Sequence, residues 1–177
     1  HVKAFKNVPK ARIAALCNPS GRNLDGDFSN VGGNLGTQDP LKIDMTDVAA
    51  YRDFNELLQN PDIDLIDICS PTVTHEELAI RALEAGKHVL VEKPMARTAE
   101  SARRIVEAAE KSSKLLMPAM CLRFWPHWRY VKEAVADGRF GKVLSARFRR
   151  VAEPPGWGTN NYMSGAQSGG ALLDLHI

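Results

Sequence analysis

Short apolar runs alternate with longer amphipathic stretches along most of this sequence. The apolar runs show little alternation with polar residues, which is typical of strands that are buried on both faces of a parallel sheet. Runs of roughly four to eight such residues favour strands over helices. We expect these strands at residues 11–18, 64–71, 88–91 and 114–120.

Helices are expected between the strands, because residues that cap helices precede stretches with apolar positions at helical spacing. Asp53 and Thr98 are such caps, and Thr74 forms a capping-box pattern with Glu77 three residues later. The predicted helices cover residues 1–8, 53–58, 75–85, 99–112 and 126–136. In the fourth helix, one apolar stripe is formed by Ala102, Ile105, Val106 and Ala109.

The order strand–helix–strand–helix–strand, with short connections, predicts an α/β fold with a doubly wound parallel sheet. Residues 141–150 differ, because they alternate apolar and polar at period two and predict a strand with one exposed face. We therefore expect one domain over residues 1–120 and the beginning of a second over residues 121–177. Residues 18–42 are rich in glycine and polar side chains and predict a long loop.

Composition and net charge limit the partners and the compartment that we expect for this protein. A net charge of +2 gives no electrostatic reason to expect nucleic acid or an anionic membrane as a partner. The three cysteines, Cys17, Cys69 and Cys121, lie in or beside apolar runs without paired spacing, which favours buried free thiols in a reducing compartment. The five histidines show no metal-ligand spacing, so we expect no metal. We find no membrane-spanning segment and no signal peptide, and expect a cytoplasmic protein that acts on a small molecule.

The strand at 88–91 delivers Glu92, Lys93 and Pro94 directly at its carboxyl end. Ligands of open α/β sheets bind outside the carboxyl ends of the strands. The ends of two other predicted strands, at residues 70–72 and 120–123, open on the same edge. Lys93 is therefore a candidate site residue, although a surface lysine after a strand is the ordinary alternative.

Several stretches together resemble the glucose–fructose oxidoreductase and inositol dehydrogenase family (Gfo/Idh/MocA). They are HxxxxxxxP at the start, DLIDICSPTVTH, AGKHVLVEKPMA, LRFWP and SGGALLDLHI. The resemblance implies an N-terminal Rossmann domain and a C-terminal α/β domain with a large, open, mostly antiparallel sheet. It also implies hydride transfer between NAD(P) and a hydroxyl-bearing carbon of a sugar, cyclitol or related polyol.

The same resemblance assigns the catalytic residues. Lys93 matches the family's acid/base lysine, and the peptide before the matching proline, here Lys93–Pro94, is often cis. Asp174 matches the aspartate of a D-x-x-x-H pattern and is the second catalytic candidate, with a helix-surface carboxylate as the alternative. His176 is two residues after Asp174 rather than four, so it does not take the histidine's role.

Residues for the cofactor are expected at two places. The second family strand ends here in Asn18, Ser20 and Arg22, where NAD-preferring members carry an acidic residue. A neutral residue followed by donors favours NADP over NAD, although Asn18 can still accept from a ribose hydroxyl. The family's nicotinamide-side and rim residues correspond to Ser70, Pro71, Thr72, His75, Glu92, Lys93 and Arg123. His75 as a plain helix residue and Arg123 as a surface residue are the alternatives.

Substrate contacts are expected from Lys93, Asp174 and the loop that holds Trp157, Asn161 and Tyr162. The family's glycine-rich phosphate loop and most of its C-terminal sheet have no counterpart here, so we expect an internal stretch of a longer protein. The resemblance also implies a homo-oligomer, as a dimer or tetramer. Two other functions stay open: a non-catalytic NAD(P)-binding regulator, and a glycoside-cleaving relative that recycles its cofactor.

Overall fold

A computed structural model describes residues 1–32, 40–149, 151, 164–170 and 173. Its strands form two parallel groups. β1 (Ala15–Cys17) pairs with β2 (Ala49–Tyr51), and β4 (His88–Val91) lies between β3 (Leu65–Ile68) and β5 (Leu116–Pro118). The predicted α/β class and parallel pairing are confirmed. The described residues contain no helix long and apolar enough to cross a membrane.

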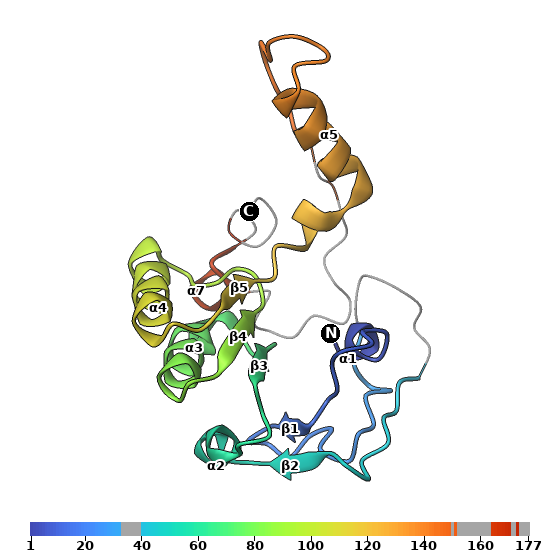
Figure 1. The fold of residues 1–177 in the computed structure, drawn as a ribbon, viewed down its shortest axis with the longest axis vertical. Coiled ribbons are helices and arrows are strands. Elements are labelled where there is room, and N and C mark those ends of the chain that lie inside the picture. Colours follow the sequence, from blue (N-terminus) through green and yellow to red (C-terminus); the bar gives the residue numbers. More distant parts are fainter. Residues whose placement is uncertain (33–39, 150, 152–163, 171–172, 174–177) are drawn as a thin grey trace.

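Helices follow the strands in the predicted order. They are α1 (Val2–Phe5), α2 (Phe54–Gln59), α3 (His75–Glu84), α4 (Ala99–Ser112), α5 (Pro126–Ala136) and the short α7 (Gly165–Ser168), with 3-10 turns at Thr72–Thr74 and Cys121–Phe124. In Figure 1, α3 and α4 lie side by side along the sheet β3-β4-β5, and α2 lies beside β1 and β2. After β5 the chain leaves the sheet, and α5 extends away from it. The domain division after residue 120 stays a prediction.

Local capping signals explain where α2 and α4 begin. The Asp53 side chain accepts a hydrogen bond from the N–H of Asn55, and the Thr98 hydroxyl accepts one from the N–H of Ser101. Both bonds satisfy N–H groups that the helix leaves without a partner. The capping box predicted for α3 is wrong, because Thr74 makes no capping bond. Its hydroxyl donates to the carbonyl of Pro71 instead.

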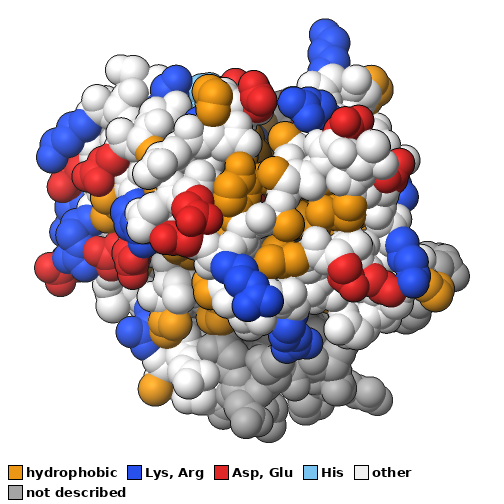
Figure 2. Space-filling model, turned by 90° about the horizontal axis from the view of Figure 1, so that it is seen from below, with side chains coloured by type: hydrophobic (Ala, Val, Ile, Leu, Met, Phe, Trp, Pro, Cys, Tyr) orange, Lys and Arg blue, Asp and Glu red, His pale blue; other side chains and the backbone are white. Residues whose placement is uncertain are grey.

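The core lies between the sheet β3-β4-β5 and the helices α3 and α4. In β3 and β4, buried and more exposed residues alternate, so these strands bury one face rather than both as predicted. Seen from below, apolar side chains gather across the middle of the molecule and charged side chains lie mainly around them (Figure 2). The buried cluster consists of Leu57, Ile63, Ile66, Ile68, Ala79, Ala82, Leu83, Val89, Val91, Ala96 and Ile105.

Two predictions about individual segments are wrong, and one strand was not predicted. Residues 141–149 form no strand, and Leu144 there is 91% exposed, since the segment pairs with no strand in the described part of the chain. β2 was missed, because three residues are too few for a periodic signal. In α4, Ile105 is fully buried, but Val106 is 40% exposed and does not belong to the apolar stripe.

The cysteines are free, as predicted, but they are not all buried. Cys17 in β1 is half-buried, whereas Cys69 and Cys121 are exposed. Both exposed thiols follow strand ends, where the chain leaves the sheet. Position at the sheet edge, rather than the apolar neighbours in the sequence, decides their exposure.

Candidate cofactor and catalytic site

The strands β3, β4 and β5 end level with one another. Ile68 is paired with Val91, and Val91 is paired with Pro118. Because the strands are parallel, the segments that follow them leave from the same edge of the sheet. Three sequence-predicted segments are thus brought together there: residues 70–72, 92–94 and 120–123.

Lys93 lies at this edge, two residues past the end of the β4 pairing, and is half-buried. The backbone before it is fixed by a hydrogen bond from the Glu92 N–H to the carbonyl of Ile68, at 2.9 Å. The Lys93 N–H donates to Oε2 of Glu92 at 2.7 Å. The Lys93–Pro94 peptide is cis, as the resemblance implied. The backbone of Lys93 is therefore held at the carboxyl end of the central strand, and the side-chain amine is attached to it there.

His75, the first residue of α3, lies between two of the segments at this edge. Its side chain is buried, with 1% of the residue exposed. The Nδ1 atom is 2.9 Å from the carbonyl oxygen of Pro94, and the Nε2 atom is 2.9 Å from that of Ser70. The Ser70 hydroxyl in turn bonds the Thr74 hydroxyl at 2.6 Å. Both ring nitrogens of His75 thus face backbone oxygens of the edge.

His1 joins β3 to β4 from the face of the sheet that α3 and α4 leave uncovered. Its Nδ1 atom is 2.8 Å from Oδ1 of Asp67, and its Nε2 atom is 3.0 Å from Oε1 of Glu92. The hydrogen bonds to Asp67, Cys69 and Glu92 raise the pKa of His1 to about 12. Burial alone raises the pKa of Glu92, but the bonds from His1 and the Lys93 N–H outweigh it and lower that pKa overall.

One group of metal-ligating side chains occurs in the described part of the chain, formed by His1, Asp67 and Cys69. Metal binding requires a deprotonated imidazole nitrogen and a thiolate. The neighbouring carboxylates raise the pKa of His1, and desolvation of the sulfur raises the pKa of the Cys69 thiol, although Cys69 as a whole residue is exposed. Without a bound ion, these contacts favour a protonated His1 between the carboxylates of Asp67 and Glu92.

The loop after β1 is held by its own side chains. Oδ1 of Asn18 accepts from the Ser20 hydroxyl at 2.9 Å, and Nδ2 of Asn18 donates to the Arg22 carbonyl at 3.0 Å. Gly21 has a φ of +79°, and a Cβ atom there would lie 2.5 Å from a guanidinium nitrogen of Arg52. Arg52 directly follows β2 and brings a second cation to this loop.

Sequence reasoning missed Arg52, Asp67 and the contacts of His1. The available signals were a polar residue directly after β2, which is Arg52, and a polar residue within β3, which is Asp67. Because β2 was not predicted, the first of these signals was missed. Arg123 lies in the turn after β5 and is exposed. The remaining candidates lie outside the described residues: Trp157, Asn161, Tyr162 and Asp174.

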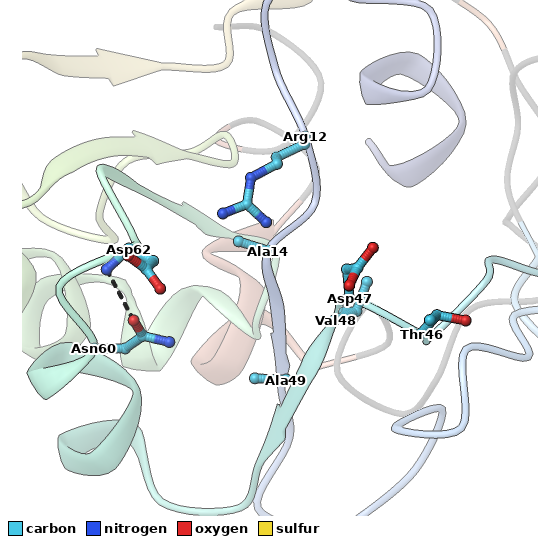
Figure 3. Close-up of a pocket in the computed structure, with 8 residues that line it drawn as sticks. All are labelled: Arg12, Ala14, Thr46, Asp47, Val48, Ala49, Asn60 and Asp62. Atoms are coloured by element: carbon cyan, nitrogen blue, oxygen red, sulfur yellow. Dashed lines mark hydrogen bonds between the residues drawn. The ribbon is translucent and has the colours of Figure 1, made fainter.

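A cavity of about 310 Å³ lies elsewhere, at the amino ends of the strands. Arg12 and Ala14 line it just before β1, and Asn60 and Asp62 line it before β3 (Figure 3). The Asp62 N–H donates to Oδ1 of Asn60 there at 2.8 Å. Because ligands of open α/β sheets bind at the opposite end, this cavity is separate from the candidate site.

Comparison with known families agrees with this arrangement. Residues 1–120 match the model of the Gfo/Idh/MocA oxidoreductase family, described as having an NAD-binding Rossmann fold. The chain belongs to this family.

Among curated family members, myo-inositol 2-dehydrogenase of Thermotoga maritima is 37% identical over 130 residues, which are 72% of this chain and 37% of that protein. A putative myo-inositol dehydrogenase from Sinorhizobium meliloti has a similar structure, with a TM-score of 0.62 and 28% identity over 80% of this chain and 38% of that one. The WlbA dehydrogenase of Chromobacterium violaceum, solved with NADH and UDP-GlcNAcA, has a TM-score of 0.51 and 31% identity over 53% and 27% of the two chains. The chain thus spans well under half the length of these relatives.

Proposed function

We propose that this chain is the cofactor-binding part of an NAD(P)-dependent oxidoreductase. The reaction would move a hydride between nicotinamide and a hydroxyl-bearing carbon of a sugar, cyclitol or related polyol. The observation that carries the proposal is Lys93, an amine at the carboxyl end of the central strand with its backbone tied to Glu92. Family relatives named as inositol and glucoside dehydrogenases support the substrate class.

Alcohol oxidation requires a group that accepts the hydroxyl proton as the hydride leaves carbon. We assign this role to the side-chain nitrogen of Lys93, which accepts the proton in oxidation and returns it when the reaction runs toward reduction. Asp174 is proposed to hold the substrate hydroxyl beside Lys93. Trp157, Asn161 and Tyr162 are the proposed contacts that select the substrate.

The hydrogen-bond donors at the carboxyl ends of the strands suit a nicotinamide dinucleotide. This cofactor supplies the hydride acceptor when it is bound. Ser70, Pro71, Thr72 and Glu92 are proposed to line the nicotinamide side, together with Arg123. In the loop after β1, Ser20 and Arg22 offer donors to a ribose 2′-phosphate. Arg52 adds a second guanidinium beside Gly21. This donor set supports NADP in preference to NAD. We also propose that the protein assembles as a homo-oligomer, a dimer or tetramer.

The test measures NAD(P)H formation by the full-length protein over a panel of inositols, sugars and diols. Lys93→Ala is compared with Lys111→Ala, a control at an exposed lysine of α4. We expect Lys93→Ala to lower kcat by about a hundredfold or more, and the control to match the wild type. Turnover that survives in Lys93→Ala contradicts the assignment. Cofactor binding without turnover indicates a regulator, and product formation without net NAD(P)H indicates the cofactor-recycling reaction.

A further inference from the structure

His75 makes an unusual pair of contacts for a histidine in a core. Both ring nitrogens lie 2.9 Å from carbonyl oxygens, one of Ser70 and one of Pro94. Neither oxygen belongs to α3, the helix that His75 begins. Ser70 lies beyond the end of β3, and Pro94 lies beyond the end of β4. The ring therefore bridges two segments of the sheet edge instead of serving its own helix.

The two contacts require hydrogen-bond donors on the imidazole ring. A carbonyl oxygen only accepts hydrogen bonds, so each contact needs an N–H donor on the ring. A ring with one proton donates to a single carbonyl, and a doubly protonated ring donates to both. An apolar side chain of similar size fills the space but leaves both oxygens without this donor, which is costly in a buried place. Packing alone therefore does not account for a histidine at this position.

The carbonyl of Pro94 belongs to the residue directly after Lys93. Lys93 is thus held from both sides: its own N–H bonds Glu92, and the next carbonyl faces His75. The carbonyl of Ser70 belongs to the proposed nicotinamide-side segment. One buried ring thus contacts both the segment that carries the proposed proton acceptor and the segment proposed to receive the cofactor.

We infer that His75 is a positioning residue that sets Lys93 relative to the nicotinamide-side segment through its bonds to Pro94 and Ser70. The inference rests on the proposed function of Lys93. It replaces direct cofactor contact as the role of His75, because both ring nitrogens already face protein oxygens. Displacements of about 1 Å in such an arrangement lower rates by about a hundredfold.

Two amide substitutions separate the two contacts. In His75→Asn the amide nitrogen stands in for Nδ1 and keeps a donor for Pro94, whereas in His75→Gln it stands in for Nε2 and keeps a donor for Ser70. His75→Leu removes both. We expect His75→Asn to keep kcat within a few-fold of wild type and to raise KM for the cofactor. We expect His75→Gln and His75→Leu to lower kcat by about ten- to a hundredfold.

Thermal melting of each variant gives the folded fraction, and kcat is expressed per folded molecule. A merely structural role predicts that His75→Asn and His75→Gln change the melting temperature but give the same kcat and the same KM. That result overturns the inference, as does wild-type kcat in His75→Leu. A rate preserved by Asn and lost in Gln supports it, because both are amides in the same buried place.

A second readout works without turnover. Trinitrobenzenesulfonate modifies lysine amines, and peptide mass spectrometry follows Lys93 with Lys111 as the internal reference. We expect His75→Gln and His75→Leu to change the Lys93 rate several-fold relative to Lys111, and His75→Asn to leave it near wild type. An unchanged Lys93 rate in all three variants contradicts the positioning role. If wild type turns over no substrate while the Lys93 rates still separate, the proposed function fails, and what stands is that His75 fixes the position of Lys93.

Discussion

The Nε2 atom of His1 lies 3.0 Å from Oε1 of Glu92, the residue that also accepts the backbone N–H of Lys93. His1 and Glu92 are 91 positions apart in the sequence. Asp67 bonds the other ring nitrogen, so an imidazolium lies between two carboxylates at the ends of neighbouring strands. The start of α1 is thereby tied to the segment that carries the candidate catalytic lysine.

This ion group makes a contribution to stability that depends on pH. The pKa of His1 is raised from its ordinary 6.5 to about 12 in the folded protein. A raised pKa means that the stabilisation is complete below about pH 6.5 and declines as the pH rises toward 12. We expect the gap in melting temperature between wild type and His1→Gln to be widest at mildly acidic pH and to shrink steadily at alkaline pH. A gap that stays constant from neutral to alkaline pH contradicts the assignment.

Lys87 is predicted to be a structural lysine. It is 8% exposed, and its Nζ atom donates to the carbonyls of Asn60 and Ile63, each at 2.8 Å. Lys87→Met keeps the aliphatic chain but leaves both carbonyls without this donor. We expect a loss of about 1–3 kcal/mol in the free energy of unfolding, measured by urea denaturation. Lys111→Met is the exposed control, and an equal effect of the two substitutions rules out the role of the buried bonds.

Cofactor choice is predicted to depend on the loop after β1. We expect Arg22→Ala and Arg52→Ala each to lower kcat/KM for NADP by about tenfold, with little change for NAD, because each removes a charged donor to the 2′-phosphate. Arg12→Ala is the matched control, since Arg12 is exposed at the opposite end of β1. Asn18→Asp should also favour NAD, by placing a negative charge near the 2′-phosphate. Equal losses with both cofactors contradict the proposed NADP preference.

Neighbouring residues of α4 provide a test of the core. Ile105 is fully buried, whereas Val106 is 40% exposed. We expect Ile105→Ala to lower the free energy of unfolding by about 2–5 kcal/mol, because it removes buried methyl groups and leaves a cavity. Val106→Ala should cost less than about 1 kcal/mol. Similar losses at the two positions would mean that α4 packs with a different face against the sheet.

Much of the local structure follows from the sequence. Asp53 and Thr98 begin α2 and α4 because their side chains bond N–H groups two or three residues away. The predicted limits of β4 and α5 match the structure, since an apolar run in one case and a proline start in the other act within the segment. The position of Lys93 at a strand end follows from the same local pattern.

Contacts between distant segments were decided by the tertiary structure alone. No pattern within residues 141–149 indicates whether a partner strand is present, and because the described residues offer none, the period-two alternation produces no strand there. Thr74 prefers the carbonyl of Pro71 to the end of its own helix, which only the folded loop reveals. His1 meets Asp67 and Glu92, and His75 meets Pro94, because parallel strands bring their carboxyl ends to one edge. The sequence determined which residues could carry the chemistry, and the pairing of the strands determined which of them lie together.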